Sequence, residues 1–311
     1  MSIRIHLDTD IGGDIDDLCA MAMLLKRDDL EITGVTTTAD DGGKRAGYAR
    51  YVLKLAGRTE IPVAAGADVS SGDYRYRPRY PSDYPSEEVY WPEPIDPTPN
   101  PVADAIELLK RSIEQGALVV GIGPYTNLAL LDRRYPGLLN RTKLFLMGGC
   151  IYPARAGFPS WGNDMDYNVQ FDAASARHCI ECLNPTLIPL TVTIETALRR
   201  AYLPRLEESG PVGRLIAGQA RAFAEDWDNE GRYGRTCDEI PQDTINFQHD
   251  SLACAVAAGW DGARTELIPL ELGTRAGWMC ESVSKSGRPT SVVTEIDREA
   301  FNQFWLDTVT S

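Results

Sequence analysis

The sequence predicts an α/β protein built as a single domain, with a mostly parallel central sheet flanked by helices. Short apolar runs alternate along the chain with longer segments of helical periodicity, a pattern typical of βα units that form a parallel sheet. The 311 residues suffice for one large domain, and no linker-like composition separates two halves. We therefore expect one domain over residues 1–311.

Each predicted strand is a short apolar run, and each predicted helix repeats its apolar positions every three or four residues. Strands are expected at residues 3–9, 32–38, 61–64, 117–122, 143–147, 187–192 and 266–270. Helices are expected at residues 16–26, 44–55, 102–114, 126–133, 173–182, 212–227, 251–258 and 298–308. Ligands of such sheets bind beyond the carboxyl ends of the strands, so the loops that follow strands should carry the functional site.

The segment from residue 68 to residue 101 differs from the rest because it is rich in Pro and Tyr and lacks regular periodicity. A loop of this length is either a lid over a site or an irregular surface excursion, and both interpretations stay open. Its aromatic side chains either stack on a flat leaving group or pack against the body of the protein. They include Tyr74, Tyr76, Tyr80, Tyr84, Tyr90 and Trp91.

The acidic composition excludes some classes of partner. The formal net charge is −14, without a cluster of Lys or Arg, so nucleic acid and acidic membranes would be repelled. No apolar stretch approaches the roughly 20 residues of a membrane helix. The seven cysteines are scattered and odd in number, which indicates reduced thiols. We expect a cytoplasmic protein, in which the pair Cys179 and Cys182 is structural.

The clearest functional signal lies at the end of the first predicted strand, where five carboxylates occur within ten residues. Carboxylates this close raise one another's pKa unless a cation compensates them, and Ca²⁺ accepts about six to eight oxygen ligands in flexible geometry. A lone Asp-Asp pair before a helix is usually ordinary capping, but five acids with two glycines favour a hard metal ion. The acids are Asp8, Asp10, Asp14, Asp16 and Asp17, and the glycines are Gly12 and Gly13.

A second metal-dependent class competes for this motif. Haloacid-dehalogenase-type phosphatases also begin with Asp-x-Asp after a first strand, where a nucleophilic carboxylate works with magnesium. Those enzymes usually carry Thr or Val two residues after the second Asp, where this chain has Gly12. That difference disfavours the phosphatase, which release of phosphate from an aryl phosphate would reveal.

The acidic loop resembles the N-terminal Asp-x-Asp-Pro-Gly-x-Asp-Asp motif of the inosine-uridine-type nucleoside hydrolases, in a variant one residue longer. Further resemblances follow in family order as far as residue 253 and span about four-fifths of the chain, which makes them jointly specific. They are Gly-Pro-Tyr-Thr-Asn-Leu-Ala at 123–129, Leu-Met-Gly-Gly at 146–149, Asn163 with Asp-Tyr-Asn at 166–168, Asp-Ala-Ala at 172–174, and His-Asp-Ser-Leu-Ala at 249–253. The resemblance implies a nucleoside hydrolase-like fold with a Rossmann-like core.

The resemblance also implies a calcium ion that binds the ribose 2′ and 3′ hydroxyls and a water molecule. Its ligands would be Asp10, Asp17, Asp250 and the backbone carbonyl of Thr126. Asp10 would in addition take a proton from the water, which the cation makes more acidic. Asp16 would accept a hydrogen bond from the 2′ hydroxyl.

The remaining implied roles concern the sugar and the leaving group. Asn168 would bind the 3′ hydroxyl, and Asn163 and Asp166 would face the 5′ end of the ribose. The acidic site would stabilise the positive charge that develops on the ribosyl ring as the bond breaks. His249 is a candidate for protonating the departing base. The expected partner is a small nucleoside or N-riboside, and a homodimer or homotetramer is possible.

Several residues depart from the family pattern. Ile11 replaces Pro, Thr191 replaces a carboxylate, and Asp166 is one methylene shorter than the usual Glu, so its contact with a 5′ hydroxyl would be weaker or bridged by water. The base is not identified, and residues 223–233 with Trp227 are a second candidate wall for it. These departures keep open a ribosyl-binding or regulatory protein that has lost turnover, which would bind ribose and release no base.

Overall fold

The computed structural model describes residues 2–71 and 87–311. Its main sheet has nine strands in the order β10-β9-β11-β6-β5-β4-β1-β2-β3, and β7 pairs with β8 in a small antiparallel sheet. The strands are β1 Ile3–Thr9, β2 Leu30–Thr37, β3 Val63–Ala65, β4 Leu118–Gly121, β5 Leu144–Met147, β6 Pro185–Ile188, β7 Leu198–Arg199, β8 Thr244–Asn246, β9 Ala263–Arg275, β10 Trp278–Val283 and β11 Arg288–Ile296.

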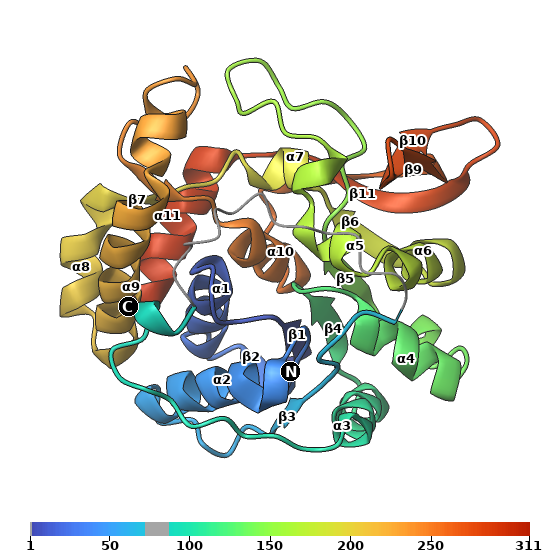
Figure 1. Ribbon diagram of the computed structural model, residues 1–311, viewed down its shortest axis with the longest axis horizontal. Helices are drawn as coiled ribbons and strands as arrows, with labels where there is room; N and C mark the ends of the chain where they lie inside the picture. Colours follow the sequence, from blue (N-terminus) through green and yellow to red (C-terminus); the bar gives the residue numbers. More distant parts are fainter. Residues whose placement is uncertain (1, 72–86) are drawn as a thin grey trace.

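Helices cover both faces of this sheet (Figure 1). They are α1 Asp16–Leu25, α2 Lys44–Leu55, α3 Val102–Glu114, α4 Thr126–Arg134, α5 Tyr167–Phe171, α6 Ala173–Cys182, α7 Leu190–Thr193, α8 Leu203–Glu208, α9 Pro211–Trp227, α10 His249–Ala257 and α11 Arg298–Val309. Helices α1, α2, α9, α10 and α11 share one apolar core, and α3, α4 and α6 share a second. The predicted α/β fold with a mostly parallel sheet is therefore confirmed.

The order in which the chain adds strands to the sheet reverses at β1, and this reversal determines where the site lies. Strand β1 pairs in parallel with β2 on one side and with β4 on the other, because the chain runs outward through β2 and β3 before it returns to β4. Loops leave the two central strands in opposite directions at such a point and open a crevice at their carboxyl ends. Asp10 follows β1, and Thr126 lies beyond the end of β4.

The local sequence pattern predicted the bounds of one strand and three helices correctly. Strand β1 and helices α2, α3 and α6 have the predicted bounds. The strand expected at 187–192 is wrong beyond Ile188, where Pro189 ends the ladder because it has no N–H to donate, and α7 begins. The strand expected at 266–270 belongs to the longer β9, which forms an antiparallel hairpin with β10.

The segment at 68–101 is only partly described. Tyr74, Tyr76, Tyr80 and Tyr84 lie outside the described residues. Trp91 packs against the body, where its ring stacks on Tyr48 at 4.2 Å between centroids and its Nε1 donates to the carbonyl of Gly12 over 3.1 Å. Tyr90 contacts Phe223 of α9. These two aromatic residues therefore support the acidic loop and α9.

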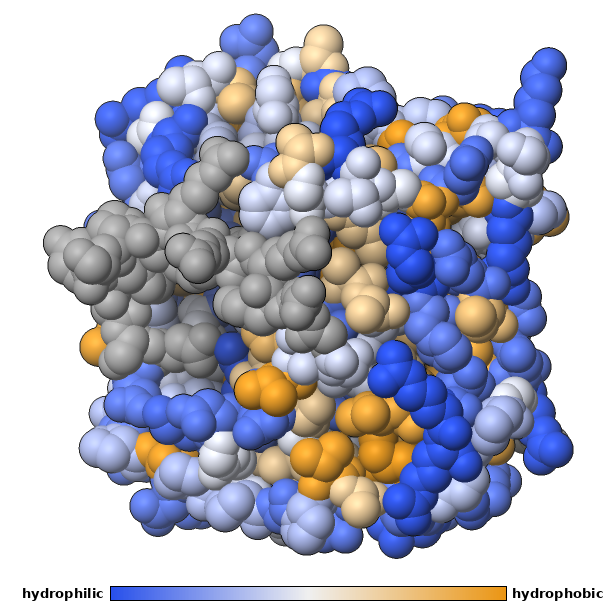
Figure 2. Space-filling model, turned by 45° about the vertical axis from the view of Figure 1, so that its right-hand side comes forward, coloured by the Kyte–Doolittle hydropathy of each residue, from blue (hydrophilic) through white to orange (hydrophobic). Residues whose placement is uncertain are grey.

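The surface of the molecule is mainly polar on the face shown in Figure 2. Hydrophobic residues gather there in limited areas. Among the helices of the described ranges, none combines the length and apolar composition that a membrane crossing requires. All seven cysteines are unpaired thiols, which confirms the absence of a disulfide framework and leaves Cys179 and Cys182 as two free residues of α6.

Candidate active site

Asp16 and Asp17 form the first turn of α1, where the helix dipole favours negative charge. Both are buried, with 5% and 4% of their surface exposed. The hydroxyl of Thr9 donates to Asp17 and accepts from the backbone N–H of Ile11 over 3.1 Å. The end of β1 therefore holds the second carboxylate in place and shapes the loop between strand and helix.

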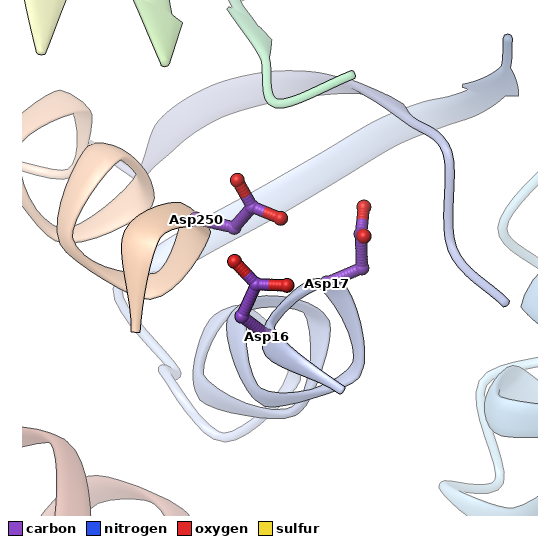
Figure 3. Close-up of side chains that lie close together, drawn as sticks. All are labelled: Asp16, Asp17 and Asp250. Atoms are coloured by element: carbon purple, nitrogen blue, oxygen red, sulfur yellow. The ribbon is translucent and has the colours of Figure 1, made fainter. Parts of the chain in front are cut away.

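Asp250 joins this pair from a distant part of the chain. It lies in the first turn of α10, which packs beside α1 and leaves Asp250 only 3% exposed. One oxygen from each of Asp16, Asp17 and Asp250 lies within 4.8 Å of the other two. Figure 3 shows the three carboxylates turned toward one another between the starts of the two helices.

These three carboxylates repel one another. Burial raises the pKa of each, and neighbouring negative charges raise it further. For Asp17 the largest of these charges is that of Asp10, and Arg45 offsets only part of the effect. The all-oxygen donor set and the accumulated negative charge fit a hard divalent cation.

Asp10 stands beside this group. The described carboxylates close enough to share one ion are Asp16, Asp17 and Asp250, whereas the resemblance places Asp10 in the ligand set and Asp16 on the sugar. Asp10 is half-buried, and the loop after β4 passes close to it. A Cβ on Gly123 would lie 2.7 Å from Asp10 Oδ1, so only glycine permits this approach.

Asp8 lies deeper and organises the strand ends. Its Oδ1 accepts from Thr36 Oγ1 over 2.5 Å and from Asn127 Nδ2 over 2.8 Å. Asn127 Nδ2 also donates to the carbonyl of Thr37, and its Oδ1 accepts from the N–H of Ala67. Burial chiefly raises the pKa of Asp8 to about 7. These bonds tie β1, β2 and the start of α4 together, a structural role that the sequence motif did not reveal.

Thr126 begins α4 and connects that helix to α6. Its hydroxyl donates to Asp172 Oδ2 over 2.9 Å. Asp172 also caps α6, where its Oδ1 accepts from the N–H of Ser175 over 3.0 Å. The Thr126 backbone, whose carbonyl is the implied metal ligand, is thereby held at the carboxyl end of β4.

Three further residues predicted to bind the sugar gather at the end of β5. Asn168 Nδ2 donates to the carbonyls of Ile122 and Met147 over 2.9 and 3.2 Å, which fixes the orientation of its side-chain amide. Asp166 precedes α5 and accepts from the N–H of Gly149 over 2.6 Å. Asn163 lies in the short 3₁₀ helix η4 Asn163–Met165.

Glu281 is a fourth residue here, and the sequence analysis missed it. Asn163 Nδ2 donates to its Oε2 over 3.0 Å. Glu281 comes from β10, a strand that local pattern did not predict, and it is only 4% exposed. The available signal was a charged residue in phase with the apolar Met279, because alternate residues of a strand face the same side.

His249 lies against an aromatic group. Its Nδ1 is 2.6 Å from Thr193 Oγ1, and that hydroxyl donates to the carbonyl of Leu190, so the imidazole donates its Nδ1–H to Thr193. Its ring contacts those of Trp161 and Phe247. Burial lowers the pKa of His249 to about 3, so the imidazole is neutral near pH 7 and carries a lone pair on Nε2.

A second aromatic group lies on α9, where the ring of Trp227 stacks on Phe223. Tyr233, in the same predicted wall, instead contacts Trp161 and Phe247. The candidate wall at 223–233 is thus divided between the two groups. Trp161 was not singled out in the sequence, although it precedes Asn163 by two residues.

Comparison with known proteins agrees with this geometry. The family described as inosine-uridine preferring nucleoside hydrolase matches residues 5–303. The chain belongs to this family. Its members are nucleoside hydrolases, enzymes that act on N-glycosyl compounds.

Individual relatives are similar in sequence, and solved structures are similar in fold. It is 25% identical over 240 residues to a pyrimidine-specific ribonucleoside hydrolase, RihA, of Salmonella paratyphi C, with 72% of each chain covered. The fold is similar to that of a purine-preferring ribonucleoside hydrolase from Gardnerella vaginalis, with a TM-score of 0.77, 19% identity, and 99% and 98% of the two chains covered. A plant nucleoside hydrolase gives a TM-score of 0.76 at 18% identity, with both chains fully covered.

Proposed function

We propose that this nucleoside hydrolase uses Ca²⁺ to hydrolyse the N-glycosidic bond of a ribonucleoside or related N-riboside, giving ribose and free base. The observation that carries the proposal is the convergence of Asp16, Asp17 and Asp250 at the starts of α1 and α10. Buried carboxylates in this number need a cation, and oxygen donors suit calcium. The unpaired cysteines support a reducing compartment, for which we propose the cytoplasm.

In this proposal Asp10, Asp17, Asp250 and the Thr126 carbonyl hold the ion. Asp17 and Asp250 lie in the three-carboxylate group, and the charge of Asp10 acts strongly on Asp17. Asp16, in the same group, either hydrogen-bonds the 2′ hydroxyl or joins the ligand set. A bound calcium ion compensates the carboxylates and makes a water molecule beside it more acidic.

Side chains of the site deprotonate the water, orient the ribose and stabilise the developing charge. Asp10 takes the proton of the attacking water. Asn168 presents Oδ1 to the 3′ hydroxyl, and Asn163 and Asp166 face the 5′ end, so the ribose is oriented at both ends. The buried carboxylates stabilise the positive charge that develops on the ring as the bond to the base breaks.

Calcium removal tests the cofactor. We expect about one calcium ion per chain by elemental analysis, loss of free base and ribose release after dialysis against a strong chelator, and recovery when calcium is restored. Activity that survives complete removal of calcium would contradict the assignment. Ribose binding without base release, in protein loaded with calcium, would support the ribosyl-binding alternative.

His249→Ala tests the proposed leaving-group acid. To protonate a base, His249 must first gain a proton on Nε2, and burial opposes this. If His249 does donate this proton, the variant should slow the hydrolysis of inosine or uridine, which have poor leaving groups, and should spare that of p-nitrophenyl riboside, whose phenolate leaves without a proton. The measured quantity is the ratio of the two kcat/KM values, from which loss of folded protein cancels. An equal decrease for both substrates would make His249 a structural residue.

A further inference from the structure

Glu281 is directed into the sugar end of the site by the packing of β10. Met279 and Glu281 occupy alternate positions of β10, and both are buried, with 3% and 4% exposed. Gln170 of α5 fastens the strand, because its Nε2 donates to the carbonyl of Met279 and its Oε1 accepts from the N–H of Met279, over 2.8 and 3.0 Å. Two residues later Glu281 therefore faces α5, which carries Asn168.

Glu281 and Asp166 bind consecutive amides of one loop. The N–H of Gly149 donates to Asp166 over 2.6 Å, and the N–H of Cys150 donates to Glu281 Oε2 over 3.1 Å. Gly148 and Gly149 have φ values of 147° and 101°, a region that favours glycine. A Cβ on Gly148 would also meet the hydroxyl of Tyr125 at 2.4 Å. The Gly-Gly turn after β5 thus brings two carboxylates to one place.

The two carboxylates differ in how they are engaged. Both oxygens of Asp166 accept backbone hydrogen bonds, from Gly149 and from Val169 of α5. Glu281 Oε2 accepts from Asn163 and Cys150, but its buried Oε1 has no hydrogen-bond partner among the described residues. Burial, followed by the charge of Glu281, raises the pKa of Asp166 to about 7. Burial also raises the pKa of Glu281, and the hydrogen bonds from Cys150 and Asn163, followed by the charge of Arg177, offset only part of this effect.

We propose that Glu281 determines specificity at the 5′ end of the ribose. With Asp166 it makes this end of the site anionic, so the protein favours ribosides whose 5′ group donates hydrogen bonds or carries positive charge, and it rejects 5′-phosphates. Glu281 acts through Asn163, which it positions, and through its own negative charge. The inference rests on the proposed hydrolase function and narrows its substrate class.

The experiment compares uridine with 5′-amino-5′-deoxyuridine, 5′-deoxyuridine and uridine 5′-phosphate. In the native protein we expect kcat/KM to fall in the order of 5′ group ammonium, hydroxyl, hydrogen, phosphate. In Glu281→Gln, which keeps the shape, the ammonium-to-hydroxyl ratio should fall and the phosphate-to-hydroxyl ratio should rise, each on the order of tenfold. If Glu281 had only a structural role, its substitution would lower kcat/KM for all four substrates by a similar factor.

Two variants separate charge from shape. Glu281→Asp keeps the charge and should keep the native order of substrates even if all rates fall. Glu271→Gln removes one charge from the exposed face of the same hairpin and should leave every ratio unchanged. Native-like order in Glu281→Gln, or good turnover of uridine 5′-phosphate by the native protein, would overturn the inference. The second result needs no variant to fold.

If the protein is not a hydrolase, the experiment gives a result that differs from the one expected when only the role of Glu281 is wrong. In that case the native protein releases a free base from none of the four compounds, and from no purine ribonucleoside such as inosine. Calorimetric binding of 5′-amino-5′-deoxyuridine and uridine 5′-phosphate to the calcium-loaded protein then tests the anionic pocket without turnover. Tighter binding of the ammonium compound, reduced in Glu281→Gln, would still support the inference, and equal binding of the two would contradict it.

Discussion

Asp10→Ala is expected to lower the turnover of every substrate by about 10²–10⁴-fold, the range typical of general acid–base catalysis. If Asp10 holds the ion and takes the proton of the attacking water, its removal affects a function that every substrate requires, whatever group leaves. The loss should therefore be of similar size for p-nitrophenyl riboside and for uridine. The measurement is kcat/KM for both substrates in the presence of calcium, with folding checked by circular dichroism.

The control for this prediction is Asp14→Asn. Asp14 lies in the same acidic loop but is exposed, and its Oδ1 accepts from Asn246 Nδ2 over 2.5 Å. Its substitution removes one negative charge that acts on Asp16 and leaves the proposed base in place, so it should lower turnover much less than Asp10→Ala does. Comparable losses in Asp14→Asn and Asp10→Ala would mean that the loop charge as a whole matters, and the assignment of Asp10 as the base would be wrong.

Asp17→Asn should have the second large effect, which differs between the calcium-loaded and calcium-free protein. A carboxylate ligand becomes a neutral and poorer one, so calcium affinity and turnover should both fall by at least tenfold. In calcium-free protein the same change should raise Tm. The pKa of Asp17 is raised in the folded state, so near pH 7 its buried charge opposes folding, and a neutral side chain removes that penalty.

Thermal unfolding with and without calcium measures both parts of this prediction. Calcium should raise the Tm of the native protein, because it binds the folded state, and should raise that of Asp17→Asn much less. Glu208→Gln, at an exposed position of α8, is the matched control and should behave as the native protein does. An equal calcium-dependent rise in Asp17→Asn would show that the ion does not bind at Asp17.

The accuracy of the sequence predictions depended on how long and how regular the apolar pattern of an element is. Helices α2, α3 and α6 had the predicted bounds because their apolar positions repeat regularly and their ends carry turn residues. Strands β7, β8, β10 and β11 were missed, and β7 and β8 have only two and three residues. Much of β9 and β10 is exposed or half-buried, so their apolar positions do not form the short continuous run that indicates a buried strand.

The composition of the acidic loop was readable in the sequence, because Asp16 and Asp17 lie next to each other at the start of a strongly predicted helix. The resemblance to the family added Asp250 and His249. The sequence does not assign the roles within this group, because the distances between carboxylate oxygens determine which of them can share an ion. The structure groups Asp16 with Asp17 and Asp250, whereas the family motif alone assigns Asp16 to the sugar.

The sequence by itself therefore determined the α/β class, the family and the acidic loop after β1, because local periodicity and contiguous motifs are enough to identify each of them. Only the tertiary structure decided that Asp250 of α10 faces Asp17 of α1, and that Glu281 of β10 lies beside Asp166. Both contacts join elements far apart in the chain. They follow from the packing of α10 on α1 and of β10 on α5, and the pattern of residues within a single element does not specify the neighbour against which that element packs.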